Sequence, residues 1–309
     1  MTAVVIGAAG AARTAGHPDS VGPPAARRHA VSDVRHRPQW PPAGHLPATG
    51  GEHTAGVSHP YLDAAAPLAF AHRGGAAQGD ENTVAAFARA VALGYRYVET
   101  DVHATSDGVP VVFHDATLDR VTGEPGRIAA LRWADLATVR VGGAAVVPRL
   151  DEVLAAWPEI RFNVDVKADG GVRPTVATVE RVGAGERVLL ASFSDARLAR
   201  LRVLAGPKVA TSLGMRGVAR LRWASLTGQR LRLPPSVVAA QVPVRFGRVP
   251  VVDRRLVRYA HRLGLHVHVW TIDEPDEMHE LLDLGVDGIM TDHVGVLRDV
   301  YRSRGHWAA

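Results

Sequence analysis

The sequence of 309 residues contains no cysteine and no long uninterrupted apolar stretch. The lack of cysteine excludes disulfides, thiolate zinc sites, iron–sulfur clusters and cysteine nucleophiles. No run approaches the ~18 apolar residues that a membrane-spanning helix requires, so we expect none. Lysine is nearly missing too: Lys167 and Lys208 are the only two among 36 basic residues. The net charge of +5 therefore rests on arginine, a pattern typical of GC-rich coding, and we expect no nucleic-acid partner.

The first sixty residues lack any lasting apolar period. They contain 8 Pro, 8 Gly and 6 His, and such a segment cannot bury enough surface to offset its ordering entropy. We predict that residues 1–60 are a disordered extension; a translation start further along, near Val57, is one alternative, and a metal- or nucleic-acid-binding tail is another. No basic segment precedes the apolar residues at the start, so a secretory signal is not predicted and we expect a cytoplasmic protein.

Residues 61–309 amount to 249 residues, close to the ~250 of a (β/α)8 barrel. Strand-like and helix-like segments alternate along them, so we predict an α/β fold of the TIM-barrel class as a single domain. The expected strands are Leu68–Arg73, Tyr97–Val102, Arg161–Lys167, Arg187–Phe193, Lys208–Leu213, Val237–Val242, His266–Thr271 and Gly288–Thr291. The expected helices include Thr83–Leu93, Leu150–Trp157, Arg173–Val182, Asp195–Leu204, Asp253–Leu263 and Pro275–Leu284. Asn82 is the expected N-cap of the first helix, and Gly94 should follow its end.

One strand breaks this alternation. Val109–His114 is strand-like, but only the turn-forming residues Ser106-Asp107-Gly108 stand between it and the second barrel strand. We therefore predict that strand 2 runs past the barrel rim and folds back as a hairpin. His114 would then return to about the level of Asp101.

Polar side chains gather at the carboxyl ends of the predicted strands, the face that carries the active site in barrel enzymes. The candidates are His72, Arg73, Glu99, Asp101, His114, Asp165, Lys167 and Trp270. Singly, each has an ordinary structural interpretation, such as a solvated strand face, a surface histidine, a salt bridge or a rim packing residue. Taken together they do not, because buried charges must be compensated.

The three carboxylates Glu99, Asp101 and Asp165 would repel one another unless a cation lay between them. Oxygen ligands without cysteine favour a hard divalent cation, Mg²⁺ or Ca²⁺, over zinc. Arg73 and Lys167 are suited to neutralising a phosphate. Because two histidines also supply an acid–base pair near neutral pH, the set favours cleavage of a phosphodiester.

These residues resemble the motifs of the glycerophosphodiester phosphodiesterases, barrel relatives of phosphatidylinositol-specific phospholipase C. The matching segments are His72-Arg73-Gly74 with Glu81-Asn82-Thr83, Glu99-Thr100-Asp101, Asp107-Gly108, His114-Asp115, Asp165-Val166-Lys167, Ser192-Phe193, Trp270-Thr271 and Gly285–Asp292. They follow in family order over residues 68–293. The resemblance implies metal-dependent hydrolysis of a small glycerophosphodiester to glycerol 3-phosphate and an alcohol.

The resemblance also implies a role for each candidate. His72 and His114 would be the general acid and base, in an order left open. Glu99, Asp101 and Asp165 would hold the metal, and Arg73 and Lys167 the phosphate, while Trp270 would either line the substrate or pack the rim. Direct attack by water and attack by the substrate's own glycerol hydroxyl both remain open.

The sequence departs from the family pattern at two positions. Asp80 stands where the motif has proline, which should affect only the approach to the first helix. Asp165 stands where the family has glutamate and is one methylene shorter. The identity of the metal and its affinity are therefore less defined than the reaction.

An arginine-rich stretch invites a second interpretation. Residues 216–262 contain eleven Arg and one acidic residue, Asp253. Weak contact with an anionic membrane surface, and a lysophospholipase D-like activity there, is one interpretation. The other, which the sequence favours, is a solvated helix whose arginine stems cover apolar surface. A non-catalytic phosphate- or nucleic-acid-binding protein is a remote third alternative.

Overall fold

The computed structural model describes residues 59–62 and 67–307. The predicted extension lies outside the described residues except for its last two, so its disorder and the domain boundary near residue 60 stay predictions.

Eight parallel strands close into a barrel, as the sequence predicts. They are β1 (Leu68–Ala71), β2 (Tyr97–Ala104), β6 (Arg161–Val166), β7 (Val188–Ala191), β8 (Ala210–Ser212), β9 (Val237–Pro243), β12 (His266–Trp270) and β13 (Gly288–Thr291). Each strand pairs with the next in this order, and β13 pairs with β1 to close the ring. The carboxyl ends of all eight strands therefore meet at one face of the barrel.

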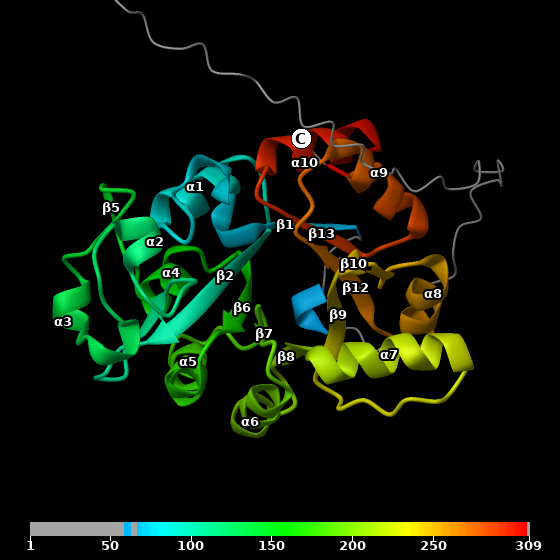
Figure 1. The fold of residues 1–309 in the computed structure, drawn as a ribbon, viewed down its shortest axis with the longest axis horizontal. Coiled ribbons are helices and arrows are strands. Elements are labelled where there is room, and N and C mark those ends of the chain that lie inside the picture. Colours follow the sequence, from blue (N-terminus) through cyan, green and yellow to red (C-terminus); the bar gives the residue numbers. More distant parts are fainter. Residues whose placement is uncertain (1–58, 63–66, 308–309) are drawn as a thin grey trace, which may run out of the picture. The chain divides into compact units, whose positions relative to one another are not determined.

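One helix follows each barrel strand or its insertion and covers the sheet from outside (Figure 1). These helices are α1 (Val84–Ala92), α4 (Leu150–Ala156), α5 (Val172–Arg181), α6 (Asp195–Ala205), α7 (Met215–Thr227), α8 (Arg254–Arg262), α9 (Pro275–Leu284) and α10 (Val294–Ser303). The six predicted helices are confirmed, and α7 and α10 are additional. Each of these two carries glycine in its first turn, Gly217 or Gly295, which weakens a helical pattern in the sequence.

The start of α1 differs from the prediction. Thr83, not Asn82, is the N-cap, because its hydroxyl accepts a hydrogen bond from the Ala86 backbone N–H at 3.2 Å. Gly94 follows the helix end with φ +98° as expected. Asp80, which replaces the motif proline, forms an ion pair with Arg89 of α1 at 2.7 Å and so ties the preceding loop to the helix.

The hairpin after β2 is confirmed. β3 (Pro110–Val112) runs antiparallel to the end of β2, with Val112 opposite Val102. The backbone N–H of Phe113 donates to the Asp101 carbonyl at 2.9 Å, which returns His114 to the level of Asp101.

The insertion then continues to Arg149. It contains α2 (Asp119–Thr122), α3 (Trp133–Leu136), β4 (Arg140–Val141) and β5 (Ala145–Val146). Its side chains form a hydrophobic cluster of their own around Phe113, Ile128 and Leu136.

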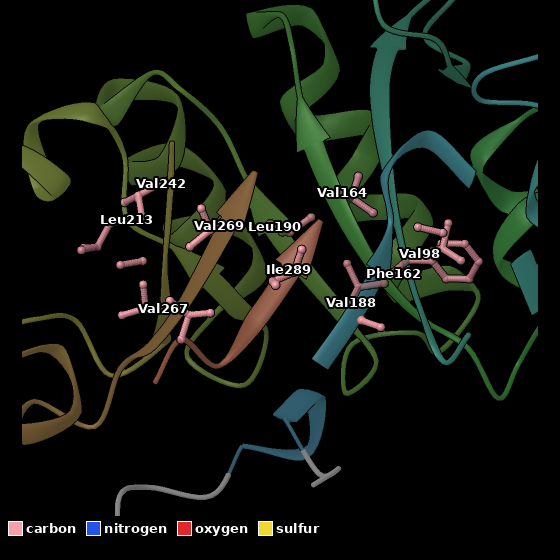
Figure 2. Packing of buried hydrophobic residues seen from close by; sticks show 14 of the residues in the cluster. Val98, Phe162, Val164, Val188, Leu190, Leu213, Val242, Val267, Val269 and Ile289 are labelled. Atoms are coloured by element: carbon pink, nitrogen blue, oxygen red, sulfur yellow. The ribbon is translucent and has the colours of Figure 1, made fainter. Parts of the chain in front are cut away.

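The barrel has an outer and an inner core. Side chains such as Val164, Leu190 and Ile289 point from the strands toward the surrounding helices (Figure 2). The interior holds a second cluster that includes Tyr61 and Tyr97. The Tyr97 hydroxyl donates to the Tyr61 carbonyl at 2.8 Å, so the short 3-10 turn at Pro60–Leu62 is anchored to the barrel interior. None of the described helices is long and apolar enough to span a bilayer.

One motif residue serves the fold rather than the site. Asp287 accepts hydrogen bonds from the His261 ring and from the Val267 backbone N–H, both at 2.8 Å. It therefore joins α8, β12 and the start of β13.

Candidate active site

One cavity of about 670 Å³ contains every site residue that the sequence predicts. Its lining includes His72, Arg73, Glu99, Asp101, His114, Asp165, Lys167 and Trp270. The carboxyl ends of several barrel strands supply these side chains. Trp270 also packs edge-on against Phe193, with ring centroids 5.5 Å apart.

A tight turn after β1 positions the first two residues. Arg73 has φ +51°, a left-handed conformation that is unusual outside glycine. The next residue has to be glycine, because a Cβ on Gly74 would come within 2.7 Å of the Phe87 side chain. The turn directs the Arg73 backbone N–H to Glu99 Oε2 at 3.1 Å.

Asp101 is buried, with 1% of its surface exposed, and is surrounded by donors. Lys167 Nζ lies 2.7 Å from Oδ1, Arg73 Nε 3.2 Å from Oδ2, and the Asn82 amide donates to Oδ2 at 2.9 Å. Burial alone would raise the pKa of Asp101, but Lys167 and Arg73 outweigh it and hold the pKa below its usual value. Asp101 is therefore charged at neutral pH.

The two neighbouring acids differ from Asp101. Burial, with repulsion from Asp101, raises the pKa of Glu99 to about 7. Burial also raises the pKa of Asp165, although Lys167 Nζ contacts Asp165 Oδ2 at 2.7 Å. Negative charge is thus crowded at this end of the barrel.

Asn82 has a function at the site that the sequence does not predict. This residue has φ +59°; its side-chain oxygen accepts from the Thr100 hydroxyl at 2.7 Å while its amide donates to Asp101. Asn82 belongs to the motif Glu81-Asn82-Thr83, but its position before a helix predicts an N-cap and not a contact with Asp101. Asn82 holds the loop before α1 against β2.

Each candidate histidine is oriented by a carboxylate. His72 Nδ1 lies 2.7 Å from Asp292 Oδ1, and His114 Nδ1 lies 2.6 Å from Asp115 Oδ1. Since the carboxylate accepts from Nδ1, the Nε2 atom of each ring is the one available for proton transfer. Asp115 and Asp292 stand within the sequence motifs, but no local pattern indicates that they orient the histidines.

Arg120 links the insertion to the loop before α1. Its guanidinium contacts Asp115 at 2.5 Å and Glu81 at 2.6 Å. Glu81 in turn pairs with Arg73 at 2.9 Å. This chain of charges supports both Asp115, the partner of His114, and Arg73.

Glu99, Asp101 and Asp165 supply carboxylate oxygens, the ligands that a hard cation prefers. Among the described residues, Asp165 Oδ1 and Asn163 Oδ1 are buried oxygens without a hydrogen-bond partner, which fits such a cation. Their arrangement differs from a preformed site: within residues 59–62 and 67–307, no three acidic or histidine side chains lie at metal-ligand spacing. The Lys167 ammonium instead bridges Asp101 and Asp165.

The family profile described as "Glycerophosphoryl diester phosphodiesterase family" matches residues 72–296. The chain belongs to this family. It is a phosphoric diester hydrolase of the glycerophosphodiester phosphodiesterase class. This confirms the resemblance drawn from the motifs.

Individual relatives agree with this assignment. A probable glycerophosphodiester phosphodiesterase 2 of Mycobacterium tuberculosis is 42% identical over 244 residues, covering 78% of this chain and 92% of that protein. A lysophospholipase D of Homo sapiens is 27% identical over 266 residues, covering 74% of this chain and 84% of that protein. The crystal structure of a putative glycerophosphoryl diester phosphodiesterase from Silicibacter pomeroyi superposes with a TM-score of 0.67 at 25% identity, covering 81% of this chain and all of that one.

The contact between Asp292 and His72 generates a prediction. Burial lowers the pKa of His72, but Glu99 and Asp292 outweigh it and raise the pKa above its usual value. We expect Asp292→Asn to reduce turnover by at least ~10-fold, a part of the ~10²–10⁴ that a positioned acid or base contributes. Because one negative partner is lost, the limb of the pH–rate profile that belongs to His72 should move to lower pH.

Steady-state kinetics from pH 5 to 9 measures both effects. Asp299→Asn is the matched control, since Asp299 is an exposed aspartate of α10. An unchanged pH profile in Asp292→Asn would show that Asp292 does not position His72.

Proposed function

We propose that the enzyme hydrolyses glycerophosphodiesters to glycerol 3-phosphate and an alcohol with the help of Mg²⁺ or Ca²⁺, and that His72 and His114 act as the acid–base pair. The observation that carries this proposal is the pair of histidines, each held at Nδ1 by a carboxylate, in one cavity with two cations and three acids. A cytoplasmic location stays a prediction.

The cationic side chains and the histidines have separate roles in the proposed reaction. Arg73 and Lys167 bind the phosphodiester oxygens and offset their charge. One histidine takes the proton of the attacking oxygen, and the other protonates the leaving alkoxide at Nε2. The attacking oxygen belongs to water or to the substrate's glycerol hydroxyl.

Glu99, Asp101 and Asp165 are the proposed holders of the cation, which when bound would draw negative charge from the phosphate. The unpartnered Asp165 Oδ1 supports Asp165 as one of them. Since Lys167 bridges Asp101 and Asp165, cation binding requires this ammonium to move from at least one carboxylate. Released from it, Lys167 would be free to contact the substrate phosphate.

We expect Asp165→Asn to weaken cation binding sharply, because size is kept and charge is lost. Asp165→Glu supplies the longer side chain usual in the family and should retain measurable binding and activity. Isothermal titration with Mg²⁺ and with Ca²⁺ measures affinity, and release of glycerol 3-phosphate from glycerophosphocholine, with chelator and with metal added back, measures dependence.

Asp169→Asn is the control for Asp165→Asn, since Asp169 is an exposed aspartate that pairs with Arg197 and Arg200. Parent-like cation affinity in Asp165→Asn would place the third ligand elsewhere. Full activity after exhaustive chelation would remove the cation from the proposal.

We expect His114→Ala to lose ~10²–10⁴-fold in turnover on glycerophosphocholine, the contribution of a positioned acid or base. Cation affinity should change little, because His114 is not among the proposed ligands. A p-nitrophenyl ester, whose leaving group needs no proton, should restore turnover only in the variant of His72 or His114 that lacks the general acid.

His306→Ala is the control, since His306 is an exposed histidine near the C-terminus. Near-parent turnover of His114→Ala on glycerophosphocholine would exclude His114 from catalysis.

A substrate that keeps one acyl chain, a lysophospholipid, is the second candidate. It is supported by apolar side chains that continue the cavity beyond the phosphate-binding end, among them Leu213, Val218 and Val251. A substrate without an acyl chain would leave these apolar side chains without a contact. Comparing kcat/KM for lysophosphatidylcholine below its micelle concentration with that for glycerophosphocholine decides between the two.

A further inference from the structure

Exposed apolar side chains are concentrated around the opening of the catalytic cavity. Among the described residues, six of the ten large apolar side chains that are strongly exposed line this cavity. Five of them form what we call the mouth patch: Met215, Trp223, Leu226, Phe246 and Val249, each 49–67% exposed. Apolar surface gathered in this way marks an interaction site, whereas apolar residues scattered singly do not.

Two elements present the mouth patch. Met215, Trp223 and Leu226 are spaced by eight and three residues on α7, which places them on one face of the helix. Phe246 and Val249 lie opposite each other in the small hairpin of β10 (Arg245–Phe246) and β11 (Val249–Pro250). Figure 1 shows α7 and β10, which both border the cavity.

The same two elements carry arginines that lack an acidic partner. Arg216 and Arg220 lie on α7, and Arg245 and Arg248 in the hairpin; all four are exposed. Within the described part of the chain, none of these guanidiniums pairs with a carboxylate, and residues 216–252 contain no Asp or Glu.

Two residues from the arginine-rich stretch do not belong to this surface. Leu221 is buried, and Arg222 pairs with Asp253 at 2.7 Å. The one carboxylate near the start of α7 belongs to Asp195, which accepts from the backbone N–H of Arg216 at 2.9 Å. The four arginines thus remain a net positive border to the mouth patch.

We propose that the mouth patch and its four arginines dock the enzyme on an anionic phospholipid surface. The apolar side chains enter the boundary between headgroups and acyl chains, and the arginines pair with lipid phosphates. Charge complementarity selects this partner over a second copy of the chain, whose equally positive face would be repelled. A nucleic acid would match the arginines but would leave the aliphatic side chains of the patch without a partner.

Docking places the opening of the cavity at the level of the lipid headgroups. The proposal does not depend on the hydrolytic mechanism, because its test measures binding. Failure of the docking test leaves the histidine and cation assignments untouched, and they are tested separately on soluble glycerophosphocholine.

The experiment is sedimentation of the full chain with vesicles of phosphatidylglycerol and phosphatidylcholine at equal amounts, and with phosphatidylcholine alone. We expect binding to the anionic vesicles that weakens as salt is raised, because screening shortens the reach of the arginines. The triple variant Arg216→Gln, Arg220→Gln, Arg248→Gln should bind about 100-fold more weakly, given a factor of about five per basic residue. The double variant Trp223→Ser, Phe246→Ser should lose at least 10-fold.

Val203→Ser and Arg132→Gln are the controls. Val203 is an apolar residue of α6, 82% exposed, and the Arg132 side chain is 75% exposed, and neither contributes to the mouth patch. Both should bind like the parent. Brominated lipid should quench tryptophan emission in the parent and less so in Trp223→Phe, which locates the contact.

Three results would overturn the proposal: no binding to anionic vesicles at low salt, binding that the arginine changes reduce but the apolar changes do not, and dimerisation that the apolar changes abolish while vesicle binding persists. The second result would indicate a general polyanion site, and the third a contact between two copies of the chain. Unchanged thermal unfolding of each variant confirms that the fold is intact.

Discussion

The Asp101 carboxylate lies almost fully buried in the wall of the catalytic cavity, and its charge requires compensation from several directions at once. A buried charge that loses its partner costs several kcal/mol, so the partners are part of the fold and not additions to it. Lys167 comes from the end of β6, Arg73 from the turn after β1, and Asn82 from the approach to α1. These segments meet at Asp101 only when β1, β2 and β6 are neighbours in the closed barrel. Pairing of these three strands therefore assembles the surroundings of Asp101.

The second support of the site comes from outside the barrel strands. β2 extends beyond the rim, and its hairpin returns His114 beside Asp101. The insertion that follows has its own apolar cluster, and it sends Arg120 back to Glu81 at the β1–α1 loop. The insertion is thus held at two points, by strand pairing and by charge. The two histidines sit on different supports, His72 on the barrel and His114 on the insertion.

The sequence was sufficient for the barrel because β-branched runs and their spacing reflect burial on both faces of a parallel sheet. It was also sufficient to predict that the eight candidate residues lie together, since the strand ends of a barrel converge, and the structure places all eight in one cavity. Their roles stay predictions. It was insufficient where a residue acts through tertiary contacts that no local pattern encodes. Asp292 lies 220 positions from His72 in the sequence, and no local sequence pattern predicts the contact between them. Asn82 looked like a helix cap because Asn is common there, and only the fold shows its amide turned toward Asp101.

The sequence likewise predicts only part of the surface around the mouth patch. The excess of arginine over acidic residues could be counted, but a count does not separate Arg222, which is paired, from Arg220, which is not. Burial divides the apolar residues in the same way, with Leu221 facing the core and Trp223 facing out.

The filled interior of the barrel limits the routes by which substrate and products reach and leave the catalytic cavity. Tyr61, Phe70, Tyr97, Leu189 and Met290 belong to one packed cluster, so side chains of the described residues fill the inside of the ring. Ala191 and Met290 of this cluster also line the catalytic cavity, so the packed interior forms the floor of the cavity. The intact diester and both products are therefore expected to pass through the opening at the carboxyl ends of the strands. Whatever narrows or covers it therefore controls entry and exit together.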